Sequence, residues 1–66
     1  MTSIEILKLY GTVRFQEEIS GVKCEWINGD WLRHEYGNTK EDAADQVLGS
    51  LHYLIYRHVR QIESGW

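Results

Sequence analysis

The side chains of this chain that could bind a metal ion are His34, His52, His58 and Cys24. His52 and His58 are six residues apart, which places them on different faces of a helix. The chain has no Cys-x-x-Cys pair, so local spacing does not bring four ligands together. The sequence therefore predicts no metal site, and Cys24 is interpreted as a small buried residue of a hairpin.

The candidates for a catalytic nucleophile are Ser20, Ser50 and Cys24. Nucleophilic catalysis needs a base and an orienting group beside the nucleophile, inside a pocket. No pattern in the sequence marks any of the three positions in that way, and the chain has no glycine-rich phosphate-binding loop. We therefore expect neither enzymatic activity nor a cofactor.

Basic and aromatic side chains are interleaved over residues 40–60, namely Lys40, Tyr53, Tyr56, Arg57 and Arg60. A basic and aromatic surface is typical of nucleic-acid-binding proteins. However, seven Lys and Arg stand against ten Asp and Glu, and the net charge is −3. Because binding to phosphates usually needs a basic face, we do not expect nucleic acid as the main partner. A nucleic-acid-binding regulator that uses the basic end of a helix remains an alternative.

The acidic side chains are a second candidate surface. They are Glu17, Glu18, Asp30, Glu35, Glu41, Asp42 and Asp45. One acidic face would steer a basic partner toward the protein. A solvated surface with a favourably charged first helical turn explains most of the same residues. The sequence leaves both interpretations open.

Large aromatic side chains are numerous for a chain of 66 residues, with three Trp, four Tyr and one Phe. A chain this short buries only about 60% of its unfolded surface, and small folds are commonly stabilised by a disulfide, a metal or a partner. One cysteine cannot form a disulfide within the chain, so we expect a homodimer and a further protein partner. Tyr and Trp are enriched at interfaces. The predicted interface residues are Trp31, Tyr36, Tyr53, Tyr56, Val59, Ile62 and Trp66.

The distribution of apolar residues predicts one small domain over residues 1–66 that lies in the cytoplasm. The longest uninterrupted apolar run is Tyr53-Leu54-Ile55-Tyr56, far shorter than the roughly 18 residues of a membrane span. The first residues also lack the basic start of a secretory signal.

Three segments show the alternation of β-strands. Over residues 3–15, Leu7, Leu9, Val13 and Phe15 share one parity, which predicts a strand with a bulge or a bend. Residues 22–27 and 31–36 follow, separated by Asn28-Gly29, a strong hairpin signal.

Two registers of this hairpin are consistent with the sequence. A two-residue turn at Asn28-Gly29 pairs Ile27 with Asp30 and Trp26 with Trp31. A three-residue loop over residues 28–30 pairs Glu25 with Arg33 and Lys23 with Glu35 instead. We predict the first register, because exposed ion pairs contribute only about 0–1 kcal/mol.

A long helix is predicted from Lys40 to Glu63, with Thr39 as its N-cap. Its apolar stripe has helical spacing and consists of Ala44, Leu48, Leu51, Ile55, Val59 and Ile62. The helix would be about 36 Å long, against about 20–30 Å for the strands, so another surface should cover the end of the stripe. Gly49 is either tolerated at an exposed position or marks the close approach of another backbone. The predicted fold is α+β: a three-stranded antiparallel meander with one long C-terminal helix, β-β-β-α.

The segment Gly37-Asn38-Thr39-Lys40-Glu41-Asp42-Ala43-Ala44 resembles the HicB-type antitoxin domain, in which a hairpin, a Gly-Asp/Asn-Thr turn and an acidic helix start follow one another. The resemblance covers Val13 to Leu54 and implies strands followed by a helix, dimerisation, and an antitoxin-like regulator that neutralises a toxin. Our leading interpretation is a non-enzymatic interaction protein that binds and modulates another macromolecule. Small inhibitor proteins of the phage or mobile-element type share its short length, acidity and aromatic content.

Overall fold

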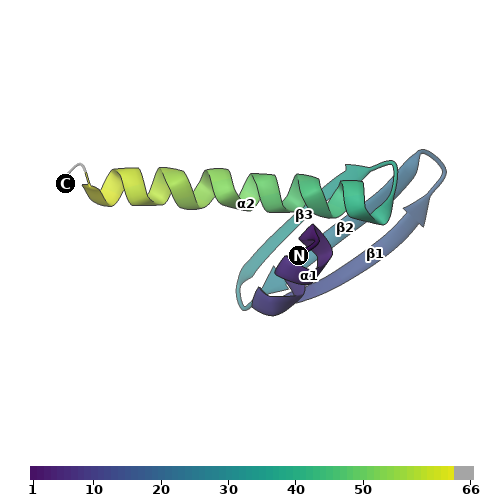
Figure 1. The fold of residues 1–66 in the computed structure, drawn as a ribbon, viewed down its shortest axis with the longest axis horizontal. Helices are drawn as coiled ribbons and strands as arrows, with labels where there is room; N and C mark the ends of the chain where they lie inside the picture. The colour runs from purple at the N-terminus through teal and green to yellow at the C-terminus, as the bar shows by residue number, and fades with distance from the viewer. Residues whose placement is uncertain (64–66) are drawn as a thin grey trace.

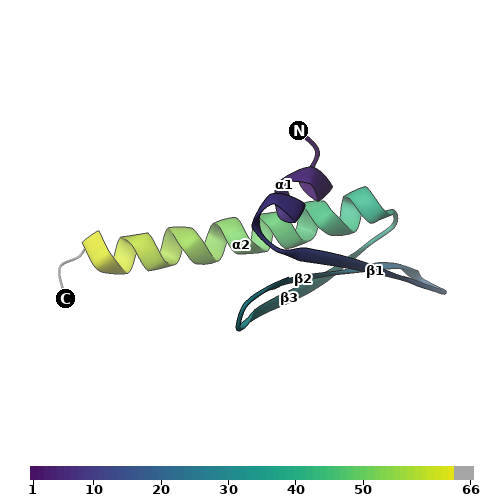
Figure 2. The same ribbon diagram turned by 90° about the horizontal axis from the view of Figure 1, so that it is seen from below.

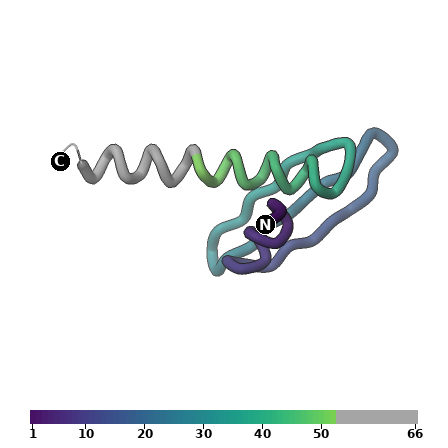
Figure 3. Tube along the Cα trace, viewed as in Figure 1, coloured from purple at the N-terminus to yellow at the C-terminus, as the bar shows by residue number. Residues whose placement is uncertain are grey.

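The computed structural model describes the backbone of residues 1–63 and the side chains of residues 1–52, which are coloured in Figure 3. The elements are α1 (Ser3–Tyr10), β1 (Thr12–Glu18), β2 (Gly21–Asn28), β3 (Trp31–Gly37) and α2 (Lys40–Glu63). The strands form an antiparallel sheet in the order β1-β2-β3, so the predicted meander is confirmed. Figures 1 and 2 show both helices on the same face of this sheet. The fold is a two-layer α+β arrangement.

The start of the chain is a helix, and the strand predicted over residues 3–15 is wrong up to Tyr10. A complete capping box starts this helix: the Glu5 N–H donates to Thr2 Oγ1 over 3.2 Å, and the Thr2 N–H donates to Glu5 Oε1 over 3.2 Å. In a strand Leu7 and Leu9 would lie on the same face, but the helix buries Leu7 and leaves Leu9 62% exposed. The capping box outweighs the short run of alternation.

The hairpin between β2 and β3 has neither of the two predicted registers. Asn28 pairs with Trp31 and Ile27 with Leu32, which leaves Gly29 and Asp30 as the turn. Gly29 has φ 59°, and within the described residues only glycines have a positive φ. A type I′ turn at Asn28-Gly29 needs positive φ at both residues, whereas a type II′ turn has glycine at its first central position. The observed turn therefore begins at Gly29, and Asn28 is the last residue of β2.

The inner face of the sheet, against the helices, carries the core. Along β2 the buried residues alternate as Val22, Cys24 and Trp26, as expected for a strand with one covered face. The core cluster joins this strand to both helices and contains Leu7, Cys24, Trp26, Ala43, Ala44, Val47 and Leu51. Small residues let α2 approach the sheet closely: a Cβ on Gly37 would lie 2.4 Å from the Ala43 nitrogen.

Helix α2 has the predicted bounds and the predicted cap, in which the Asp42 N–H donates to Thr39 Oγ1 over 3.1 Å. Ala44 and Leu51 of its predicted stripe are buried, and Leu48 packs against the core. The side chains of Ile55, Val59 and Ile62 lie outside the described residues. With 24 residues, α2 is about 36 Å long, and the strands of 7–8 residues span about 25 Å.

Gly49 faces open space in the described part of the chain, because a Cβ placed there meets no atom within 4 Å. This finding favours the interpretation that glycine is tolerated at an exposed position. Within residues 1–63, no helix combines the length and the apolar character that crossing a membrane would require.

Candidate functional site

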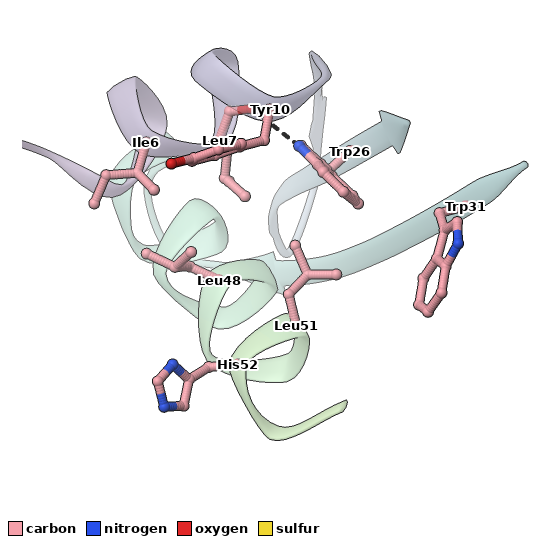
Figure 4. A pocket seen from close by; sticks show the side chains of 8 residues that line it. All are labelled: Ile6, Leu7, Tyr10, Trp26, Trp31, Leu48, Leu51 and His52. Carbon is pink, nitrogen blue, oxygen red and sulfur yellow. Dashed lines mark hydrogen bonds between the residues drawn. The ribbon is translucent and has the colours of Figure 1, made fainter. Parts of the chain in front are cut away.

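An apolar cavity of about 370 Å³ lies where α1, the sheet and α2 meet (Figure 4). Its volume is in the range of sites that accept small ligands or single anchoring side chains. Both helices and the sheet contribute to its lining, which consists of Ile6, Leu7, Tyr10, Trp26, Trp31, Leu48, Leu51 and His52.

The floor of the cavity is formed by Leu7, Trp26 and Leu51, each less than 9% exposed. The indole Nε1–H of Trp26 donates to the Leu7 carbonyl oxygen over 2.9 Å, as the dashed line in Figure 4 shows. Because this donor already has its acceptor, Trp26 presents only carbon surface to the cavity. The floor therefore offers apolar contact and no free hydrogen-bond donor from Trp26.

Gly11 makes the close packing at this floor possible. A Cβ on Gly11 would lie 2.5 Å from the Ile27 carbonyl oxygen and 2.7 Å from Trp26 Nε1. The backbone at Gly11 is extended, with φ 179°, so the requirement for glycine is steric. Because Gly11 has no side chain, the backbone between α1 and β1 can pass directly over the Trp26 indole.

The rim of the cavity carries two exposed aromatic side chains, Tyr10 at 67% and Trp31 at 59% exposure. Tyr10 ends α1 and Trp31 begins β3, and the intervening Asn28 donates from Nδ2 to the Tyr10 carbonyl oxygen over 2.7 Å. This hydrogen bond ties the hairpin to α1 and holds the two sides of the rim in place. Exposed aromatic residues around an apolar depression are typical of protein-binding surfaces.

The structure places two of the predicted interface residues, Trp31 and Tyr36, on opposite faces of the sheet. Trp31 lies on the cavity, whereas Tyr36 is 54% exposed on the opposite face of the sheet, with its ring 6.1 Å from that of His34 in an edge-on arrangement. The other predicted residues have no described side chains, namely Tyr53, Tyr56, Val59, Ile62 and Trp66. The sequence interpretation missed Ile6 and Tyr10, because it placed them on a strand.

Two of the predicted acidic residues hold α1 onto α2. The Ser3 N–H donates to Glu41 Oε1 over 2.9 Å, and the Ser3 hydroxyl donates to Asp45 Oδ1. Both carboxylates thus lie at the N-terminus of α1, where negative charge is stabilising. Glu35 is half-buried on the inner face of β3, and the exposed members of the set are Glu17, Glu18, Asp30, Asp42 and Asp45.

Two further candidates from the sequence take part in packing contacts. Ser50 Oγ accepts a hydrogen bond from Arg33 Nη2, which links α2 to β3. The Arg33 Nε–H is buried and has no acceptor in the described part of the chain. Lys40 lies over the Phe15 ring, with Nζ 5.6 Å from the ring centroid.

We expect the Cys24 thiol to be unreactive in the folded protein. It is fully buried, and burial raises its pKa, with the negative charge of Glu25 raising it further. The unfolded thiol ionises at its ordinary pKa and the folded thiol only at a higher pH. The stability that comes from keeping the buried thiol neutral is therefore complete below the ordinary pKa and is lost as pH rises toward the pKa of the folded state.

Ellman's reagent should modify Cys24 slowly in the folded protein at pH 8 and at the rate of a free thiol in urea. Equal rates in the two conditions would contradict the burial of Cys24.

Within the residues whose side chains are described, no group of three or more His, Cys, Asp or Glu is placed to hold a metal ion. Comparisons of the chain with protein-family models, with curated proteins and with solved structures found no significant match. The resemblance to HicB-type antitoxin domains therefore stays a prediction.

Proposed function

We propose that this protein is a non-enzymatic interaction module that binds another protein through the cavity between α1, the sheet and α2, and thereby modulates that protein. The observation that carries the proposal is the exposed pair Tyr10 and Trp31 at the rim of an apolar cavity. An inhibitory role follows if the bound surface of the partner is one that it needs for its own activity.

The energy available at this site is sufficient for an anchoring contact. Trp31 is 59% exposed, so a partner would remove roughly 100–150 Å² of its surface from water, worth roughly 2–4 kcal/mol. A contribution of this size is typical of the few residues that dominate an interface. Tyr10 and the half-buried Leu48 would add to it.

The chemistry of the lining favours a protein partner over a nucleic acid. None of the eight lining residues is Lys or Arg, and the whole chain has a net charge of −3, which opposes binding to phosphates. A protein supplies the aliphatic and aromatic side chains that fit an apolar cavity.

The test is affinity capture from the native host with the tagged full chain and two variants. Trp31→Ala removes the rim anchor, and Ile19→Ala is the matched control, since Ile19 is fully exposed in the β1–β2 turn away from the cavity lining. We expect one protein to be retained by the wild type and by Ile19→Ala, and its recovery to fall at least tenfold with Trp31→Ala. Equal recovery with Trp31→Ala would refute the proposal. Capture that is lost after nuclease treatment would favour the nucleic-acid alternative instead.

A further inference from the structure

On β3, charged side chains face the helices and apolar side chains face away from them. Its inward-facing residues under α2 include the charged Arg33 and Glu35, whereas Leu32 and Tyr36 face away from the helices and are more than half exposed. Ile27 pairs with Leu32 and lies beside it on the same outward face. Figure 2 shows that neither helix covers this face. An antiparallel sheet with one solvated face normally shows the opposite pattern.

We infer that this outer face binds the outer face of a second copy of the chain. The outer face is defined here by the outward-facing residues Thr12, Arg14, Gln16, Glu18, Lys23, Glu25, Ile27, Leu32, His34 and Tyr36. This surface is separate from the cavity, and its self-association would form the homodimer that the sequence led us to expect.

Charge complementarity identifies a second copy as the occupant. On the central strand β2, the outer face carries Lys23 and Glu25 at successive outward positions. Lys23 lies between Gln16 on β1 and Tyr36 on β3. Glu25 lies between Arg14 on β1 and His34 on β3. The central row therefore has one positive and one negative side chain of similar reach, which is the composition that a self-complementary surface requires.

The same charges select one of two symmetric arrangements. A two-fold axis parallel to the strands would place Lys23 on Lys23 and Glu25 on Glu25 of the second copy, which is repulsive. A two-fold axis across the strands at the level of Cys24 places each Lys23 on the Glu25 of the second copy. The same axis sets His34 on Tyr36, two rings that already contact edge-on within one chain, 6.1 Å apart. We therefore infer the second arrangement.

This arrangement tolerates the twist of packed sheets. Facing sheets lie about 10 Å apart and are rotated by about 30° relative to each other. Lys23 and Glu25 lie on the central strand directly beside the inferred axis, so the rotation displaces them least. Three strands present a footprint of about 14 by 25 Å, which is smaller than the roughly 800 Å² per partner of a standard interface, so we expect a weak dimer.

The test is sedimentation equilibrium of the full chain over a range of protein concentrations. We expect wild type to approach twice its mass of 7.8 kDa at high concentration. Glu25→Lys and Lys23→Glu each create two like-charge contacts, and each should raise the dissociation constant at least tenfold. An equimolar mixture of the two variants should form a heterodimer with near wild-type affinity, because both charge pairs are then restored across the interface. Circular dichroism confirms that each variant is folded.

A matched control tests whether an added charge weakens the dimer only when it lies on the outer face. Ile19→Glu adds a charge at an exposed apolar position outside the outer face and should leave the dissociation constant unchanged. A wild type that is monomeric at every concentration, single variants that dimerise like wild type, or a mixture that stays monomeric would each overturn the inference. None of these results would affect capture of a partner through Trp31, so the two proposals can fail separately.

Discussion

A Gly11→Ala variant is expected to lose roughly 2–4 kcal/mol of unfolding free energy, through overpacking and the loss of a buried hydrogen bond. The added Cβ would lie 2.5 Å from the Ile27 carbonyl oxygen and 2.7 Å from Trp26 Nε1. The carbonyl belongs to the backbone, so the strain is relieved only when α1 and the Trp26 indole move apart. That movement breaks the hydrogen bond from Trp26 to the Leu7 carbonyl. Urea denaturation followed by tryptophan fluorescence measures the loss.

Gly49→Ala is the matched control for this substitution. It adds the same methyl group in the exposed interior of α2, where no described atom lies within 4 Å. Alanine stabilises a helix interior by roughly 0.5–1 kcal/mol over glycine, so this variant should be more stable than wild type. Equal effects of the two substitutions would contradict the close contact at Gly11.

Trp26→Ala is expected to destabilise the protein by roughly 3–5 kcal/mol, the usual cost of truncating a buried large aromatic residue. Trp26 is 7% exposed and joins β2 to both helices in the core. Because small domains are only marginally stable, this variant should be largely unfolded at 37 °C. Thermal denaturation by circular dichroism is the measurement.

A Trp26→Phe variant separates the two roles of the indole. Phenylalanine keeps most of the apolar contact but leaves the Leu7 carbonyl without its donor, which costs roughly 1–3 kcal/mol. We expect its stability to lie between that of wild type and Trp26→Ala. A phenylalanine variant as stable as wild type would show that the hydrogen bond contributes nothing.

Most of the sheet and all of α2 could be predicted from the sequence, because regular periodicity and end signals agreed there. Thr39 as an N-cap and the apolar stripe of α2 both pointed to the same helix, and its bounds are confirmed. At the start of the chain the two kinds of signal conflicted. A short alternation favoured a strand, while Thr2 and Glu5 matched a capping box, and the box determines the structure.

The cavity could not be predicted, because it depends on α1 and on the position of the hairpin turn. Without a helix at residues 3–10, Ile6 and Tyr10 have no reason to lie near Leu48. The position of the hairpin turn at Gly29 also depends on a tertiary contact, because the Asn28 side chain donates to the Tyr10 carbonyl oxygen and takes no part in the turn. Local turn preferences carry no information on such a contact.

The central claim is that the cavity between α1, the sheet and α2 is open and accepts an apolar group. Fluorescence titration with a neutral phenylnaphthylamine dye tests it directly, with Leu48→Trp as a variant that fills the cavity from α2. We expect saturable binding of one dye per wild-type chain and its loss in Leu48→Trp, which should remain folded. No saturable binding to the wild type, or equal binding to the filled variant, would contradict it.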